Sequence, residues 1–371
     1  MFDVVIAGAG LIGMLTAREL RAGGLCVALV ERGEPAREAT WAGGGIISPL
    51  YPWRYPDAVN DLARWSQGRY AALCQALHDE SGVDPEYLRN GLVICDGDVQ
   101  ETGLAWAERV GARIARIDRS QLRELEPELA LNVDSALWMP DIAQVRNPRI
   151  GRALAIACAR SGIEMITGCD VQGIQIESGQ AAGLITAQRG VIRAGAVVVA
   201  SGAWSGGLLA TSGLQIPVMP VRGQMILYDA PAGFVRRVEL YKGHYIIPRK
   251  DGHTLVGSTL EYVGFEKGTT QDALRVLRDI ALELIPALAG FNIKHQWSGL
   301  RPGSPDGVPC IGPHPTIAGL YINSGHFRNG VVMGPASARL LVDQLLGREP
   351  ILAPVPYLPA TFAAKPAGAG I

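Results

Sequence analysis

Apolar residues follow two kinds of pattern at the start of the chain. The short apolar runs Val4 to Ala7 and Val27 to Val30 have the form of buried strands. Between them, apolar residues recur at helical spacing from Leu11 to about Arg21. The pattern therefore predicts a strand, a helix and a second strand that together form one βαβ unit.

The same two patterns predict elements along the rest of the chain. Helices are expected over 57–77, 101–110, 120–127, 148–161, 270–285 and 334–346, and strands over 92–95, 136–139, 162–166, 182–186, 195–200 and 320–323. Five more strands are expected at 225–228, 238–240, 245–248, 254–256 and 293–297, with a single helix among them. Such a run of strands favours an antiparallel sheet, inserted between parts of the α/β unit. Two stretches rich in glycine and proline, 298–309 and 359–371, are expected to form a loop and a loosely ordered tail.

Three glycines with G-x-G-x-x-G spacing stand directly after the first strand. Gly8 permits a tight turn, Gly10 lets a pyrophosphate approach the backbone, and Gly13 lets the helix pack against the strand. The helix N-terminus presents free N–H groups to phosphate oxygens. Glu31 ends the second strand, where an acid accepts hydrogen bonds from a ribose. The unit is therefore interpreted as a dinucleotide-binding site.

Further segments of small residues follow other predicted strands. Gly43, Gly44 and Gly45 come soon after Glu31, and three consecutive glycines favour backbone that lies against a ring system or a pyrophosphate. A flexible loop is the alternative. Ser201 and Gly202 begin the turn after the apolar run 195–200, at the strand end where open α/β sheets bind ligands.

Composition and charge narrow the class of protein. The 371 residues are 48% apolar and carry a net charge of −1, with no basic run, which argues against a nucleic-acid or anionic-membrane partner. The first strand begins near residue 3 and no long apolar stretch follows, so neither a signal peptide nor a membrane span is expected. Six scattered cysteines without a C-x-x-C pair favour free thiols in a cytoplasmic protein over disulfides or a metal site.

Five motifs occur in an order that is typical of one group of enzymes. They are the N-terminal glycine turn, VVASGAWS at 198–205, PVRGQ at 220–224, GLRP at 299–302 with Asp306-Gly307, and GHFRNG at 325–330. Together they resemble the superfamily of FAD-dependent D-amino acid oxidases and sarcosine oxidases. Within it the chain is most similar to the glycine oxidases, which are associated with the thiazole branch of thiamine biosynthesis. The resemblance covers nearly the whole chain.

The resemblance implies an α/β fold class: a Rossmann-like FAD-binding domain with an inserted antiparallel-sheet α+β substrate domain. The FAD-binding domain is expected to be discontinuous, over 1–88, 142–220 and 300–371. The substrate-binding domain is expected over 89–141 and 221–299. Sarcosine oxidases that tether their flavin use a cysteine just before or within the region that matches 299–306. This chain has none there, so noncovalent FAD is expected.

The resemblance also implies roles for individual residues. Arg301 and Tyr245 match the arginine and tyrosine that bind the substrate carboxylate, and a guanidinium fork suits that task. Arg328 matches a second arginine, whose role is either at the carboxylate or in stabilising the flavin loop. These three form the expected catalytic set. His244 should point to the opposite face of its strand from Tyr245, which argues against a general-base role.

Two positions of the expected substrate pocket are Leu260 and Gly299. Leu260 stands where glycine oxidases commonly carry methionine, and AGGGI at 42–46 stands where they have alanines ending in Gly-Met. These departures leave the preferred substrate size open. The cofactor-binding residues expected are Gly8, Gly10, Gly13, Glu31, Arg32, Thr40, Gly43, Gly44, Gly45, Val171, Ser201, Gly202, Trp204, Arg301, Gly325, Phe327, Arg328, Asn329, Gly330 and Val331.

The reaction implied is oxidative deamination of glycine and small relatives such as sarcosine, D-alanine and N-alkylglycines. Its products are the 2-oxo acid, ammonia or an amine, and hydrogen peroxide, with molecular oxygen as acceptor. The expected protein is cytoplasmic and a homo-oligomer, with a tetramer as one form. The alternatives are a D-amino acid or sarcosine dehydrogenase with another acceptor, and a flavin-binding subunit of a larger complex. A tRNA-modifying flavoenzyme fits the lack of basic clusters poorly.

Overall fold

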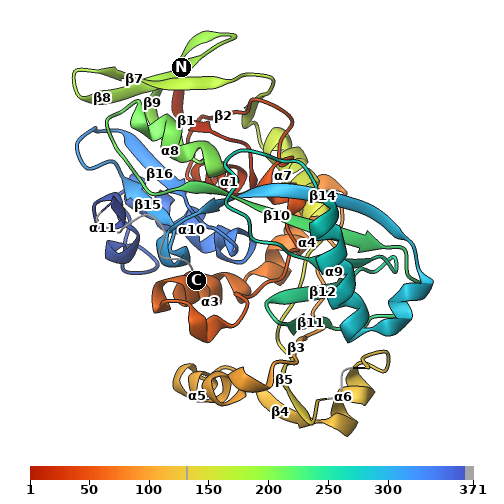
Figure 1. Cartoon of the computed structure of the whole chain (residues 1–371). Coiled ribbons are helices and arrows are strands. Elements are labelled where there is room, and N and C mark those ends of the chain that lie inside the picture. The colour runs from red at the N-terminus through yellow and green to blue at the C-terminus, as the bar shows by residue number, and fades with distance from the viewer. Residues whose placement is uncertain (131–132, 364–371) are drawn as a thin grey trace.

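Two eight-stranded sheets organise the protein in this computed structural model, which describes residues 1–130 and 133–363 (Figure 1). The first sheet has the order β15-β16-β9-β1-β2-β6, and the β7–β8 hairpin extends from β9. Its strands are β1 (Phe2–Ala7), β2 (Val27–Val30), β6 (Glu164–Ile166), β7 (Val171–Glu177), β8 (Gln180–Thr186), β9 (Gly190–Val199), β15 (Cys310–Pro313) and β16 (Leu320–Ser324). The five strands from β16 to β6 are parallel, as the βαβ pattern predicted.

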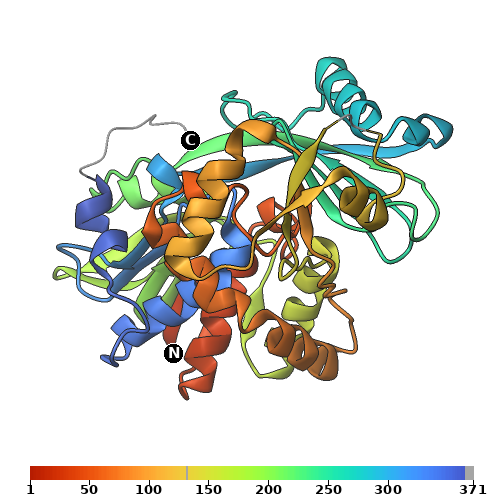
Figure 2. The same ribbon diagram turned by 90° about the horizontal axis from the view of Figure 1, so that it is seen from below.

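Alternation along β1 explains why both faces of the first sheet are covered. Val4 and Ile6 pack into one apolar core and Val5 and Ala7 into another. The first core lies under α1 (Leu11–Ala22), α3 (Asp57–Gln67), α4 (Tyr70–Ser81), α7 (Asn147–Arg160) and α10 (Gly330–Leu345). Seen from below, α1 in red, α10 in blue and α3 in orange lie side by side (Figure 2). The second core lies under the β7–β8 hairpin and α8 (Ser205–Ala210).

The second sheet has the order β14-β10-β13-β12-β11-β3-β5-β4. Its strands are β3 (Leu92–Ile94), β4 (Ala115–Asp118), β5 (Ser135–Met139), β10 (Met219–Tyr228), β11 (Val238–Tyr241), β12 (His244–Pro248), β13 (Thr254–Gly257) and β14 (Ile293–Gly303). Helix α9 (Gln271–Leu284) covers one face with the apolar stripe Leu277, Ala281 and Leu284. The sheet is antiparallel except between β11 and β3, because β3 comes from a separate segment of the chain.

Shorter elements complete the fold. They are α2 (Ala39–Ala42), α5 (Gln100–Val110), α6 (Arg119–Leu125), α11 (Pro359–Ala363), and the 3₁₀ turns at Pro52–Arg54, Gly97–Val99, Gly202–Trp204, Pro286–Gly290, Pro305–Gly307 and Val355–Tyr357. The α/β fold class is therefore confirmed. Strands β10 and β14 both continue past the expected domain boundaries at 220 and 299, and those boundaries stay a prediction. Across 1–130 and 133–363, the helices all fall short of the length and hydropathy that a bilayer crossing needs.

Several sequence-based elements were wrong in extent. The helix expected over 57–77 is two helices, because the chain bends at Gly68 and Arg69. Helix α10 begins at Gly330, four residues before its predicted start, and continues through Pro335. Strands β4, β7 and β15 were not predicted. The expected loose tail contains α11 up to Ala363, while 364–371 lie outside the described residues.

The largest correction concerns the loop expected at 298–309. Residues up to Gly303 instead belong to β14, which pairs with β10 through Gly223 opposite Gly299 and Val221 opposite Arg301. Glycine and proline made this stretch look irregular, but the long partner strand holds it extended. Arg301 therefore lies on a sheet and not on a loop.

The second sheet also buries two carboxyl groups, Glu126 and Glu239. Glu126 accepts hydrogen bonds from the backbone N–H groups of Arg236 and Arg237, at 2.9 and 2.6 Å. Glu239 is fully buried on β11 and neither of its oxygens has a hydrogen-bond partner in the described part of the chain. Burial raises the pKa of Glu126 to about 7 and raises the pKa of Glu239 well above its usual value. The neutral form of this pair is thus favoured in the folded protein.

Candidate active site

A cavity of about 560 Å³ is lined by residues of both sheets and of the loops that leave the first sheet. Its lining contains 18 of the 20 residues that were expected to bind the cofactor, Arg301 and Arg328 included. The structure thus gathers residues from Gly8 to Val331 around one space.

 Within the described residues, Gly13 and Gly325 are the expected cofactor-binding residues that lie outside the lining.

The glycine turn after β1 forms one wall of the cavity. Gly8 has a φ of +105°, and a Cβ there would lie 2.6 Å from the carbonyl oxygen of Ala200. A Cβ at Gly13 would lie 2.0 Å from the Gly8 oxygen, so this glycine lets α1 approach β1. At Gly10 a Cβ would meet only Thr40 Oγ1, at 3.5 Å. Protein packing thus leaves the space over Gly10 open, and this geometry fits the close approach of a pyrophosphate.

Side chains from two later segments complete this end of the cavity. Glu31 accepts hydrogen bonds from the N–H groups of Ala9 at 3.0 Å and Gly33 at 3.1 Å. The Thr40 hydroxyl accepts one from the Leu11 N–H at 2.9 Å. Gly10 stands at the N-cap of α1 and has no side chain to cover the first-turn N–H groups. The acid, the hydroxyl and the helix end together fit a nucleotide with a ribose and a phosphate group.

Arg32 and Trp204 stack beside the acid. The Arg32 guanidinium lies 3.7 Å from the centre of the Trp204 ring, and its Nη2 contacts Glu38 at 2.7 Å. Ser201 donates a hydrogen bond to the carbonyl oxygen of Ala7, which fixes the turn after β9 to the end of β1. Val171 and Gly202 line the cavity next to these groups. The two strand ends that were expected to face the ligand therefore meet at one edge of the sheet.

The Gly43–Gly45 loop packs tightly against neighbouring parts of the protein. A Cβ at Gly43 would lie 2.6 Å from Asn147 Nδ2, and one at Gly44 would lie 3.1 Å from the Tyr245 ring. Gly45 has a φ of +82°, and its Cβ would lie 2.0 Å from the Val145 oxygen. The need for three glycines thus comes from protein packing as well as from the cavity that they line.

Arg301 on β14 and Tyr245 on β12 belong to strands that β10 and β13 separate in the second sheet, and both residues line the cavity. Arg301 donates to Ser258 Oγ at 2.7 Å and to the Thr259 carbonyl oxygen at 3.1 Å. Burial lowers the pKa of Arg301, and the hydrogen bond with Tyr245 partly offsets this effect. A Cβ on Gly223 would lie 2.1 Å from Arg301 Nη1, so the guanidinium rests directly on this glycine. The result is a fixed cation beside a phenol hydroxyl in the cavity, which is suited to a carboxylate.

The segment before α10 supplies the second arginine. Arg328 Nη2 lies 3.5 Å from the Gly243 oxygen, in the turn between β11 and β12. Burial and the charge of Arg328 lower the pKa of His244. Tyr245 lines the cavity, whereas His244 is outside the lining of the described residues, which is consistent with strand alternation. Two roles of Arg328 therefore stay as predictions: it binds the carboxylate, or it stabilises the flavin loop.

Phe327, Asn329, Gly330 and Val331 line the cavity beside Arg328, and Phe327 has a positive φ of 44°. Gly299 also lines it. Leu260 differs, because its side chain is 39% exposed and it is outside the cavity lining that the described residues form.

Sequence reasoning missed Gly223 and Ser258 as parts of the site. Gly223 lies inside a motif that was noted, and a glycine in the middle of a strand is a signal of close approach. Ser258 had no such signal. In the described ranges the acidic, histidine and cysteine side chains form no cluster that suits a metal ion, and the six cysteines are free.

Comparison with known proteins gives four findings. The family model for FAD-dependent oxidoreductases (DAO) matches residues 3–344. The glycine oxidase of Pseudomonas aeruginosa is 50% identical over 358 residues, which cover 96% of this chain and 98% of that protein. The bifunctional protein ThiO/ThiG of Trichormus variabilis is 31% identical, and the match covers 96% of this chain and 54% of that protein. The crystal structure of glycine oxidase from Geobacillus kaustophilus superposes with a TM-score of 0.92 at 29% identity, over 96% of this chain and 98% of that one.

Proposed function

Because this chain belongs to the family of FAD-dependent oxidoreductases, we propose that it is an amino acid oxidase that deaminates glycine and its small relatives. The observation that carries this proposal is the pairing of Arg301 with Tyr245 in the same cavity as the glycine cradle. A family that binds FAD acts on many amines and alcohols, and this pair selects those that bear a carboxylate.

The residues of the site bind and orient the substrate. Arg301 holds the carboxylate, and Ser258 and Thr259 keep its guanidinium in one orientation. The Tyr245 hydroxyl donates a second hydrogen bond to the same carboxylate, and together these contacts direct the Cα–H bond towards the cofactor. If the substrate amine is neutral when it binds, the hydrogen leaves Cα as a hydride. This step requires no acid–base side chain.

Bound FAD would supply the two-electron acceptor for the hydride that leaves Cα. Loss of that hydride and of the amine proton turns the amino acid into an imino acid. Water then hydrolyses the imino acid to the 2-oxo acid and ammonia, or an amine for N-alkylated substrates. Molecular oxygen takes up the two electrons with two protons and is released as hydrogen peroxide. For glycine the products are glyoxylate, ammonia and hydrogen peroxide.

The substrate range proposed is glycine, sarcosine, D-alanine and N-alkylglycines. Leu260 supports no strong limit on size, because the residue is 39% exposed and lies outside the cavity lining that the described residues form. Likeness to the ThiO/ThiG protein supports a role in the thiazole branch of thiamine biosynthesis. Noncovalent attachment of FAD, a homo-oligomeric state and a cytoplasmic location are further parts of this proposal.

A panel assay with the flavin-loaded protein tests the proposed function. Peroxide and 2-oxo acid should form in equal amounts from glycine, sarcosine or D-alanine in air. A dehydrogenase would instead be reduced by these amines without oxygen but would recover slowly when air is readmitted. If no small amino acid were turned over or reduced the flavin, both the oxidase and the dehydrogenase would be refuted. A flavin-binding subunit would then be favoured.

A further inference from the structure

A buried arginine stands just after the strand that carries Tyr245. Arg249 is 8% exposed, and its guanidinium donates to three neutral oxygens. The acceptors are the carbonyl of Gly44 at 2.7 Å, the carbonyl of Val145 at 3.1 Å and Gln144 Oε1 at 2.8 Å. One cation therefore connects the glycine loop to a segment of the chain a hundred residues further on.

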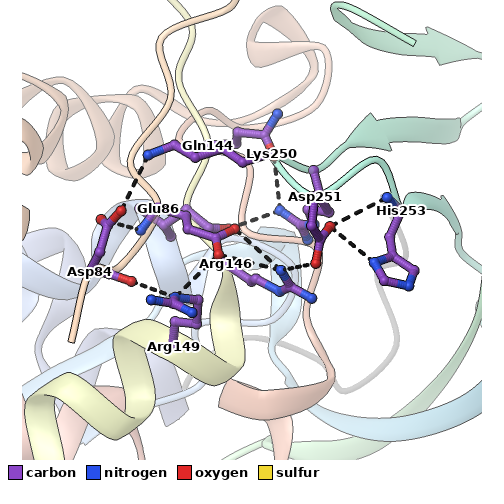
Figure 3. A network of polar contacts seen from close by, with 10 residues as sticks. Asp84, Glu86, Gln144, Arg146, Arg149, Lys250, Asp251 and His253 are labelled. Carbon is purple, nitrogen blue, oxygen red and sulfur yellow. Dashed lines mark hydrogen bonds and ion pairs between the residues drawn. The ribbon is translucent and has the colours of Figure 1, made fainter. Parts of the chain in front are cut away.

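The carboxylates nearest to Arg249, Glu86 and Asp251, lie close to its guanidinium, whereas its hydrogen bonds go to neutral oxygens. Arg146 contacts Asp251 at 2.6 Å and Glu86 at 3.4 Å, so this network joins three loops that are far apart in the sequence (Figure 3). Burial and the charge of Arg146 lower the pKa of Arg249 to about 10, while Glu86 and Asp251 act in the opposite direction. Arg249 thus stays a cation at neutral pH. A buried cation without a direct carboxylate partner is costly, so its position calls for an explanation.

The contacts of Gly44 supply that explanation. Its carbonyl is held by Arg249, and its Cα faces the Tyr245 ring so closely that a Cβ would lie 3.1 Å from Cε2. Tyr245 and Gly43–Gly45 both line the cavity. Arg249 and Tyr245 are four residues apart on one segment. The guanidinium of the first and the ring of the second both contact Gly44.

We propose that Arg249 is a positioning residue, which fixes the Gly43–Gly45 loop against Tyr245 and so sets the place of the tyrosine hydroxyl beside the substrate. Only a planar fork reaches the Gly44 and Val145 carbonyls together, whereas a lysine ammonium is a single point of charge. The proposal rests on the proposed function, because it concerns the same site.

The test compares Arg249→Lys and Arg249→Met with the parent protein. Arg149→Lys is the matched control, since Arg149 lies in the same network and contacts Glu86 and the Asp84 backbone (Figure 3). Each variant is examined by thermal melting, by titration of the apoprotein with FAD, by visible circular dichroism of the bound flavin, and by anaerobic reduction with glycine.

The lysine variant should fold, bind FAD and show an altered visible dichroism. Its limiting rate of flavin reduction should fall roughly 10-fold, because the reacting groups are misplaced by a fraction of an ångström. The glycine KM should change much less, since Arg301 is untouched. In a Tyr245→Phe background the same substitution should cost far less, because the two residues act through one contact.

Three results would overturn the proposal. The first is an Arg249→Lys protein with the dichroism and reduction rate of the parent. The second is an Arg249→Lys protein in which only the melting temperature falls. The third is a fall in reduction rate that is fully additive with the fall caused by Tyr245→Phe. If the methionine variant fails to fold, the lysine variant decides. If the parent is not reduced by any small amino acid, the proposed function fails, while the dichroism and the FAD titration still test Arg249.

Discussion

Gly223 offers the sharpest test of the carboxylate site, because its substitution displaces Arg301 without removing it. A Cβ at residue 223 would lie 2.1, 2.2 and 2.3 Å from Nη1, Nη2 and Cζ of Arg301. The guanidinium must retreat by more than about 1 Å to reach ordinary contact distances. Its hydrogen bond to Ser258 Oγ, now 2.7 Å, would then break. The backbone of β10 is not obstructed, so Gly223→Ala should fold.

The expected cost follows from the strength of a charged hydrogen bond. Loss of one such bond to the substrate weakens binding by about 1.5–3 kcal/mol. This corresponds to a fall of about 10- to 100-fold in kcat/KM for glycine. Anaerobic stopped-flow reduction of the bound flavin by glycine measures the effect. Binding of glycolate, a carboxylate that lacks the amine, should weaken by a similar factor.

Gly68→Ala is the matched control. Gly68 ends α3 with a helical φ of −64°, and a Cβ there would have no neighbour within 4 Å among the described atoms. This variant should keep the parent's kinetics. If a folded, flavin-loaded Gly223→Ala protein reduced its flavin with unchanged kcat/KM, the assignment of Arg301 to the substrate carboxylate would be refuted.

Three further predictions concern other parts of the account. Tyr245→Phe should retain the fold and FAD but lose roughly 10-fold in kcat/KM for glycine, since one hydrogen bond to a charged group is removed; unchanged kinetics in a steady-state peroxide assay would contradict its role. Glu126 and Glu239 keep protons in the folded state that the unfolded chain loses, so stability should fall as pH rises from about 5 to 8. Glu239→Gln should flatten this slope and raise the melting temperature at pH 8 by roughly 3 °C or more, whereas an unchanged slope in calorimetry would count against the pair. Denaturation and precipitation should release all FAD into the supernatant, and removal of FAD should lower the melting temperature; flavin that stays with the pellet would show a covalent bond.

The βαβ unit at the start of the chain could be predicted in detail because its signals are local. Strand, glycine turn, helix and acid follow one another within residues 2–31, and each is specified by its own side chains. The antiparallel pairing of most of the second sheet followed from the run of strands. The parallel contact between β11 and β3 did not, because it joins segments that are more than a hundred residues apart.

The end of β14 shows where local reasoning fails. Gly299, Pro302 and Gly303 have low strand propensity, yet pairing with β10 keeps them extended. Arg301 could be identified from its motif, but its fixed orientation depends on Gly223, Ser258 and Thr259, which come from other strands and loops. Leu260 was expected in the substrate pocket, but it is partly exposed and lies outside the cavity lining of the described residues. Tertiary pairing decides these positions, and no single stretch of sequence encodes it.

The central claim is that Arg301 binds the carboxylate of an amino acid in the cavity that holds FAD. The most direct measurement is the anaerobic reduction of the bound flavin by glycine, in the parent protein and in Arg301→Met, as a function of glycine concentration. We expect rapid, saturable bleaching of the parent and a loss of kcat/KM of roughly 10-fold or more in the variant. A parent that glycine leaves oxidised, or a variant reduced as efficiently as the parent, would contradict it.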